Sequence, residues 1–244
     1  MNKKTLENHW HEKFKLAAQK NRRENDYKIS LWKKEALEAY IKYFLIYFQP
    51  QIKKDNSKTL VLDIGCGPGT FSNLLAKRGF LVQGIDVVPE AIDIAKERSA
   101  NQKINYQVGN IYSLPFPDKN FDIIICLGVF QTLDNEKAAL KEIKKKLKPS
   151  GLLIITTLNR FSLFSALNIR KEFPPKRFGP FSFKKFLASE NFKEIKIKGI
   201  YFFPEKISLF TKIIIKLGLY KFFNLFFFIF NIFSHSFYIE AKNS

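Results

Sequence analysis

Residues 61–70 read VLDIGCGPGT, an apolar run that ends in an acid and opens into glycines at positions 65, 67 and 69. The run Leu60–Ile64 has the continuous apolar character of a strand that is covered on both faces. The glycines that follow allow a tight turn and a close approach of the backbone to a ligand. We therefore expect a strand, a ligand-binding turn and then a helix over Thr70–Arg78, whose first amides favour negative charge.

The spacing of these glycines separates two kinds of nucleotide-binding turn. A dinucleotide fingerprint reads G-x-G-x-x-G and would require a glycine at position 70, where this chain has Thr70. The sequence therefore argues against NAD or NADP as the ligand. A turn with a purely structural role is the alternative that the glycines alone leave open.

Downstream of this turn, strand patterns and helix patterns alternate with short connections. Such alternation predicts a parallel sheet with helices on both faces. The expected helices after the first are 90–100 and 135–147, the latter capped by Asp134. The expected strands after the first are 81–85, 104–108, 121–127 and 152–158.

The two flanks of this core complete the predicted architecture. Helices are expected at 5–24 and 30–48 as an N-terminal helical lid, and a short helix at 182–190 precedes two strands, 192–203 and 236–242. The fold class is therefore α/β: a Rossmann-like, seven-stranded, mostly parallel sheet with an antiparallel last strand and a helical insertion at 204–235. The predicted divisions are a cap (1–50), a ligand-binding core (51–160) and a C-terminal completion of the sheet (161–244).

An acid ends the second predicted strand. Asp86 stands where a carboxylate can accept two hydrogen bonds from ribose hydroxyls in nucleoside-binding α/β folds. An aspartate after a strand often only begins a turn. Its register with the glycine turn makes a ribose contact the stronger hypothesis.

Three motifs together resemble one enzyme family. The G-x-G-x-G turn, with an acid two residues before its first glycine, resembles motif I of class I S-adenosylmethionine-dependent methyltransferases. LPFPDKNFDII at 114–124 and KPSG at 148–151 resemble the subfamily that includes ubiquinone and menaquinone biosynthesis enzymes. The resemblance covers about residues 60–158 and implies S-adenosyl-L-methionine as the cofactor. The residues that it implies around the cofactor are Asp63, Gly65, Cys66, Gly67 and Gly69 near the methionine moiety, Asp86 and Val87 near the ribose, Asn110 and Ile111 near the adenine, and Leu127 along the cofactor.

The segment after the fourth strand departs from the family. Many relatives carry His-His or Glu-His where this chain has Gln131 and Thr132. We therefore name no catalytic residue and expect no metal site. His9, His11, Glu12 and Tyr27 would reach the substrate only if the N-terminal helices close over the cofactor, and otherwise they are solvated side chains on a charged helix.

Charge and aromatic residues concentrate in the flanks. The formal net charge is +19, and 19 of the 27 phenylalanines follow Arg160. An AT-rich genome alone could produce this composition. The insertion 204–235 carries lysines among its apolar residues, so we expect interfacial helices that meet a membrane surface or an apolar substrate, with ordinary core packing as the equal alternative. Two cysteines and the absence of a signal-peptide run predict a cytoplasmic protein, with peripheral contact at the inner membrane surface left open.

These observations lead to one functional hypothesis and two alternatives. The hypothesis is S-adenosylmethionine-dependent methyl transfer to a small or lipid-like acceptor, at oxygen. One alternative is methylation of RNA or protein, which the sequence pI of about 9.8 favours. The other is a non-catalytic, membrane-bound scaffold, against which the near-complete set of cofactor motifs argues. The oligomeric state does not follow from the sequence.

Overall fold

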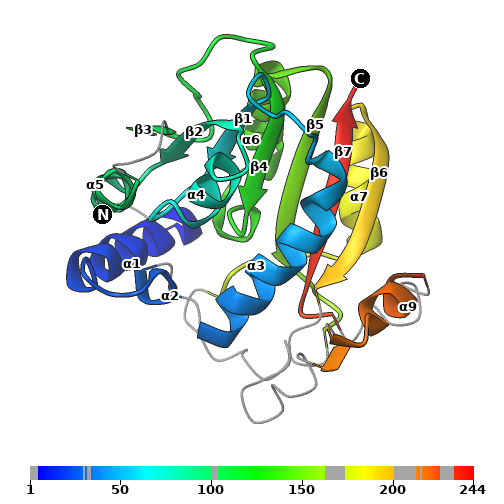
Figure 1. The fold of residues 1–244 in the computed structure, drawn as a ribbon, viewed down its shortest axis with the longest axis horizontal. Coiled ribbons are helices and arrows are strands. Elements are labelled where there is room, and N and C mark those ends of the chain that lie inside the picture. Colours follow the sequence, from blue (N-terminus) through cyan, green and yellow to red (C-terminus); the bar gives the residue numbers. More distant parts are fainter. Residues whose placement is uncertain are drawn as a thin grey trace.

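A seven-stranded sheet forms the centre of the computed structural model, which describes residues 5–29, 31, 34–99, 104–162, 174–200, 213–214, 216–225 and 234–244. The strands lie in the order β3-β2-β1-β4-β5-β7-β6 (Figure 1). The first five run parallel, and β7 pairs antiparallel with both β5 and β6. The predicted Rossmann-like sheet with an antiparallel last strand is thus confirmed. The strand bounds are β1 Leu60–Ile64, β2 Leu81–Asp86, β3 Ile104–Val108, β4 Phe121–Leu127, β5 Leu147–Leu158, β6 Phe192–Ile200 and β7 Ser236–Asn243.

Helices cover both faces of this sheet, as the alternating pattern predicts. The helices α3 and α4 pack on one face and α6 and α7 on the other, while α1 lies beside α5 (Figure 1). The helix bounds are α1 Leu6–Lys20, α2 Asp26–Ile29, α3 Lys34–Phe48, α4 Thr70–Ala76, α5 Pro89–Arg98, α6 Glu136–Lys146, α7 Pro180–Ser189 and α9 Leu219–Leu225, with short 3-10 turns η1 at Gln49–Gln51 and η2 at Phe130–Thr132.

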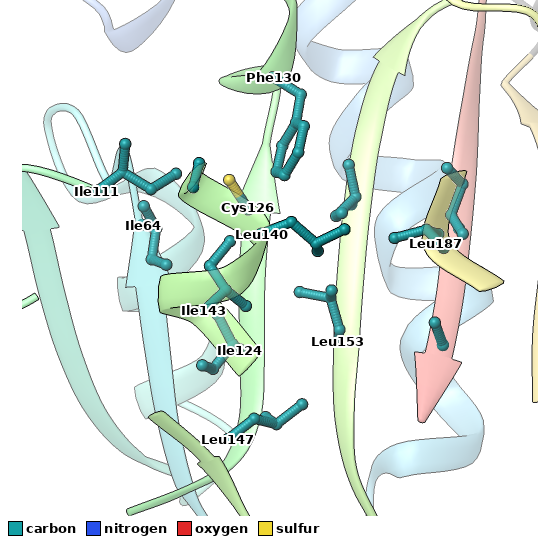
Figure 2. Close-up of a cluster of buried hydrophobic side chains, with 14 of the residues drawn as sticks. Ile64, Ile111, Ile124, Cys126, Phe130, Leu140, Ile143, Leu147, Leu153 and Leu187 are labelled. Carbon is teal, nitrogen blue, oxygen red and sulfur yellow. The ribbon is translucent and has the colours of Figure 1, made fainter. Parts of the chain in front are cut away.

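The alternation of side chains along the central strands divides the core into two halves. On β4, Ile123 and Ile125 face the cluster that contains the α3 aromatic residues, whereas Ile124 and Cys126 face the cluster under α6 and α7 (Figure 2). All four side chains are buried. The run from Ile123 to Cys126 must therefore be apolar at every position, which is the pattern that predicted this strand.

Several predicted element boundaries are wrong by a few residues. The first helix ends at Lys20, before residue 24, because Asn21 ends it and donates from Nδ2 to the carbonyl of Ala17 at 2.8 Å. The cap of α6 is Asn135 and not Asp134, since the Asn135 side chain accepts from the amide of Ala138 at 3.0 Å. The fifth strand begins earlier than predicted, at Leu147, which pairs with Phe121.

The predicted insertion at 204–235 is described only in part. Its described residues include the short helix α9. Phe226, Phe227 and Phe230 of this insertion, which could serve as the apolar anchors of the predicted interfacial helices, lie outside the described residues. Within the described part of the chain, no helix combines the length and the apolar character needed to cross a membrane.

Candidate functional site

A cavity of about 280 Å³ lies at the carboxyl edge of the parallel strands. The ends of β1, β2 and β4 form its floor, and α1 forms part of its opposite wall. In open α/β sheets this edge is where ligands bind. Nine of the ten predicted cofactor residues line the cavity, namely Asp63, Gly65, Cys66, Gly67, Asp86, Val87, Asn110, Ile111 and Leu127.

The glycine turn passes directly under the cavity. Gly65 and Gly67 have φ values of 72° and 51°, in the left-handed region that favours glycine. The amides of Gly65 and Cys66 both donate to the carbonyl of Ile85, at 2.8 and 3.1 Å. A Cβ atom on Gly65 would lie 2.3 Å from Cγ2 of Val129. The turn is therefore fixed to β2 by its backbone and has no room for a side chain at position 65.

The tenth predicted residue, Gly69, lies behind the cavity wall and does not line it. Gly69 precedes the first turn of α4 with a φ of 84°, and a Cβ atom there would meet the Tyr106 hydroxyl at 2.5 Å. The structure thus gives the third glycine of the motif a packing role between α4 and β3.

Asp86 connects the second strand to the glycine turn. Its Oδ2 accepts from the amide of Gly67 at 2.8 Å, and its Oδ1 accepts from the amide of Val88 at 3.0 Å. Burial raises the pKa of this carboxyl, and the two amide donors oppose that rise. Each carboxylate oxygen can accept more than one hydrogen bond, so both can still bind ligand hydroxyls.

A second carboxyl group lies under the same cavity. Asp63 is buried and accepts from the hydroxyl of Ser72 at 2.6 Å. The pKa of Asp63 is raised to about 7, chiefly by burial; the hydrogen bond from Ser72 opposes this rise, and the charge of Asp86 adds to it. Two carboxyl groups in one cavity favour a ligand that carries positive charge.

The remaining predicted residues form less polar parts of the wall. Asn110 uses its Oδ1 to accept from the amide of Tyr112 at 3.0 Å, so part of its acceptor capacity already serves a local turn. Ile111 is buried, and Val87 is 41% exposed. These side chains can enclose a flat apolar group, with Leu127 at the end of β4.

The helix α1 closes the cavity from the other side. Trp10, His11 and Phe14 all line the cavity from this helix. Trp10 and Phe14 are four residues apart and therefore share a helix face. Sequence analysis predicts a lid from these helices but does not single out the two aromatic side chains, although their spacing is the signal that identifies them.

Polar side chains attach this lid to the core. The Tyr112 hydroxyl donates to Oε2 of Glu7 at 2.7 Å and accepts from the amide of Asn135 at 3.2 Å. Further along, Gln19 donates to Glu90 at 2.7 Å. Two ion pairs with α5 complete the attachment, Arg22 with Glu97 and Arg98 with Asp26.

Comparison with known proteins agrees with this geometry. A family model described as a methyltransferase domain matches residues 62–155. The match covers less than half of this chain, over the segment that holds the glycine turn and most of the parallel strands.

Relatives of this methyltransferase domain point to one subfamily. A ubiquinone biosynthesis O-methyltransferase from Coxiella burnetii is 38% identical over 102 residues, which are 41% of this chain and 44% of that protein. A protein of the same name from Rickettsia akari is 34% identical over 131 residues, 53% of this chain and 52% of that protein. The matches thus span only about half the length of these curated relatives.

A solved structure extends the likeness beyond the methyltransferase domain. A S-adenosylmethionine-dependent methyltransferase from Archaeoglobus fulgidus superposes with a TM-score of 0.60 over 83% of this chain and 93% of that chain, at 22% identity. At that identity the likeness concerns the fold. The likeness of fold therefore extends well beyond residues 62–155.

The histidines do not supply an evident catalytic group to the methyltransferase domain. His11 lines the cavity, close enough to Asp86 for its charge to lower the pKa of that carboxyl. His9 and Glu12 do not line the cavity, and the side chain of Tyr27 lies outside the described residues. His11 thus lies at the Asp86 end of the cavity.

In the segment after β4, a hydroxyl group and an amide group stand in the place of histidines. Thr132 lines the cavity and donates its hydroxyl to the carbonyl of Val129 at 2.8 Å. Gln131 holds its Oε1 buried without a hydrogen-bond partner. Among the described residues, no group of three histidine, cysteine or acidic side chains is placed to hold a metal ion. Both cysteines are free and buried.

Proposed function

We propose that this chain binds S-adenosyl-L-methionine in the 280 Å³ cavity and transfers its methyl group to a hydroxyl oxygen of a small, lipid-like acceptor. The observation that carries the proposal is the meeting of the glycine turn, Asp63 and Asp86 in one cavity beneath α1. The cofactor would supply a methyl group already activated by a positively charged sulfur. Its amino group and its sulfonium suit the two carboxyl groups.

The protein's own contribution is placement and exclusion of water. Asp86 would accept the ribose hydroxyls, and Asp63 lies where it can stabilise positive charge near the glycine turn. The lid aromatics Trp10 and Phe14 keep water from the reacting centre, which strengthens the electrostatic interactions inside it. In the reaction the acceptor oxygen forms a bond to the methyl carbon as the carbon–sulfur bond breaks. The proton of the acceptor hydroxyl would pass to solvent water, and S-adenosylhomocysteine would leave as the second product.

Calorimetry with S-adenosylhomocysteine tests the cofactor site. Asp86→Ala removes an acceptor of two ligand hydroxyls, and hydrogen bonds to charged groups contribute about 1.5–3 kcal/mol each. We expect Kd to rise at least about tenfold. Asp93→Ala is the matched control, because Asp93 lies on the exposed face of α5. Equal affinities in both folded variants would remove Asp86 from the site.

A thermal-shift comparison tests the choice of cofactor. S-adenosylhomocysteine should raise the melting temperature, whereas NAD and NADP should not, since Thr70 interrupts the dinucleotide spacing. Stabilisation by a dinucleotide alone would overturn the proposal.

The acceptor atom is tested by product analysis. The relatives named as ubiquinone biosynthesis O-methyltransferases favour a hydroxyl on a quinone-like ring. We expect mass spectrometry to find one added methyl on a prenylated catechol and none on its dimethyl ether. Methylation of the ring carbon would correct the acceptor atom. Binding of S-adenosylhomocysteine without turnover of any acceptor, RNA and protein included, would support the scaffold alternative.

We also propose peripheral contact with a membrane surface through α9. Phe222 and Leu225 are 52% and 77% exposed, and Leu219 lies on the same side of this helix. Lys216 and Lys221 are exposed beside them. Apolar side chains flanked by cations suit an anionic membrane interface, where a lipid-like acceptor would be found.

Sedimentation with anionic liposomes tests this contact. Binding should weaken with salt and should fall in a Phe222→Ser/Leu225→Ser variant that retains affinity for S-adenosylhomocysteine. Leu16→Ser is the control, since it removes a 61% exposed leucine from α1. Equal sedimentation of both variants would leave α9 without a role at the membrane.

A further inference from the structure

The backbone fixes residues 176–178 at the carboxyl edge of the sheet, beside the segments that follow β4 and β5. The amide of Lys176 donates to the carbonyl of Gln131 at 2.7 Å, and Phe178 exchanges backbone hydrogen bonds with Leu158 and Arg160 at 3.0 and 2.9 Å. Arg177 therefore stands between the segment that follows β4 and the segment that follows β5. Gln131 directly precedes Thr132, which lines the cavity.

The guanidinium of Arg177 has few interactions that would offset the cost of removing its charge from water. Its Nη1 atom is buried and makes no hydrogen bond. Burial lowers the pKa of this guanidinium. Its neighbour Lys176, by contrast, forms an ion pair with Glu136 at 2.7 Å, and Arg177 forms none with the described residues. A buried cation without a partner is costly, so such a group is normally paired or held for a ligand.

Other polar groups lie at the same edge without adding negative charge. Burial, and to a smaller extent the positive charge of Arg177, lowers the pKa of His235 to about 4, so this imidazole lies near the guanidinium and is neutral at pH 7. The Oε1 atom of Gln131 is buried without a partner, and a ligand hydroxyl could satisfy it. Phe161 is 52% exposed and contacts Gly179, which is two residues from Arg177 in the sequence. Its apolar ring therefore lies near the Arg177 segment.

We propose that Arg177 receives an oxyanion carried by the methyl acceptor, a carboxylate or a phosphate ester, so that the acceptor is an amphiphile with an anionic group. This inference rests on the proposed function and narrows its substrate class. A planar guanidinium with free donors matches the two oxygens of such a group. Arg177 is thus a residue for substrate specificity and does not touch the methyl donor.

A binding experiment tests the site before any acceptor is known. Thermal shift and calorimetry are carried out on the full chain with S-adenosylhomocysteine present, using inorganic phosphate, 2-naphthoate and the neutral 2-acetylnaphthalene as probes. We expect the naphthoate to bind and Arg177→Gln to raise its Kd at least about tenfold. The Kd of Arg177→Lys should lie between those of the wild type and Arg177→Gln, because lysine keeps the positive charge but loses the paired donors of the guanidinium. Lys176→Gln is the matched control and should bind as the wild type does.

The outcomes separate the sources of the anion and the two proposals. Binding of naphthoate but not of phosphate supports an anion carried by an apolar acceptor. Binding of phosphate alone would overturn the claim that the anion belongs to an apolar acceptor. Failure of naphthoate to bind the wild type, or equal losses in Arg177→Gln and Lys176→Gln, overturns the site. Absence of a shift with S-adenosylhomocysteine in the wild type sinks the proposed function instead. Arg177→Gln should fold at least as stably as the wild type, because it removes a half-buried charge that has no ion-pair partner among the described residues.

A turnover comparison then places the site in the reaction. With 3,4-dihydroxybenzoate and 4-methylcatechol as acceptors, Arg177→Gln should raise KM for the anionic compound at least about tenfold and leave KM for the neutral one unchanged. Equal changes for both compounds would mean that Arg177 has a structural role only.

Discussion

The two sides of the cofactor cavity are held in place by different kinds of interaction. On the sheet side, the glycine turn is fixed by backbone hydrogen bonds to Ile85, above strands whose side chains are buried. On the lid side, α1 contributes Trp10 and Phe14 to the cavity. It is attached to α5 by a small buried apolar cluster that includes Ala18 and Ala91, and by polar pairs of which several are exposed. Exposed pairs contribute little to stability. The comparison teaches that backbone hydrogen bonds fix one side of the cavity, whereas side-chain contacts alone hold the other.

The largest expected effect lies on the sheet side. In Gly65→Ala the new Cβ meets Cγ2 of Val129 at 2.3 Å in a left-handed backbone conformation, so the turn must move. We expect a loss of about 1–2 kcal/mol for the conformation and about 1–3 kcal/mol for overpacking. Affinity for S-adenosylhomocysteine should fall about a hundredfold or more in calorimetry.

Gly79→Ala is the matched control for this variant. Its φ of 85° imposes the same conformational cost, but the nearest atom to its Cβ is 3.9 Å away, in Asn56. It should lose stability and keep its affinity. Equal affinities in the two alanine variants would show that the turn is not rigid.

The buried acid on the sheet side predicts a pH dependence. Because the pKa of Asp63 is about 7 in the folded protein and 3.8 as its ordinary value, the folded state binds more protons between these values. Stability should therefore fall by a few kcal/mol as pH rises from about 4 to 7. Denaturant unfolding across this range checks it, and Asp63→Asn should flatten the curve.

Ligand affinity should change in the opposite direction. Ionised Asp63 favours a positively charged group near the glycine turn, so S-adenosylhomocysteine, whose amino group is protonated, should bind more tightly as pH rises toward 7. Ser72→Ala removes the hydrogen bond that lowers the pKa of Asp63 and should move the midpoint upward. If Asp63→Asn leaves the pH profile of affinity unchanged, the charge of Asp63 does not act on the bound ligand.

A smaller effect is expected at the lid. Tyr112→Phe removes the hydroxyl that bonds Glu7 and the amide of Asn135. We expect S-adenosylhomocysteine to dissociate about 3–10 times faster, because a lost hydrogen bond of about 1 kcal/mol favours the open lid. Stopped-flow fluorescence of Trp10 can follow this step. Combined with Glu7→Gln, the effects should not add, whereas additive effects would contradict a shared contact.

The smallest effect is expected at the outer end of the lid. Arg22 and Glu97 form an ion pair in which the side chains are 48% and 57% exposed. Arg22→Gln should change neither the melting temperature nor the affinity measurably. A clear loss of affinity would mean that the lid is attached along its whole length.

Sequence reasoning succeeded where one local pattern dictates one structure. The apolar run of β4 and the glycine turn each permit one arrangement, and nine of ten named residues line the cavity. Gly69 shows the limit, because its neighbour Tyr106 comes from another strand and no local pattern reveals that contact. The partner of Glu7 is likewise 105 residues away. Arg177 is not singled out by the sequence, because only the folded structure shows that its Nη1 atom is buried without a hydrogen-bond partner.

The position of β7 has a consequence for synthesis on the ribosome. This strand inserts between β5 and β6, so β6 has no neighbour in the sheet until residues 236–243 have been made. At about 5–20 residues per second, the growing chain spends roughly 4–17 s between the end of β5 at Leu158 and the end of β7, and the edge of β5 is open throughout. Open strand edges invite pairing with other chains. Because β7 is made last, we expect a chaperone to contact the open edge of β5 during that interval.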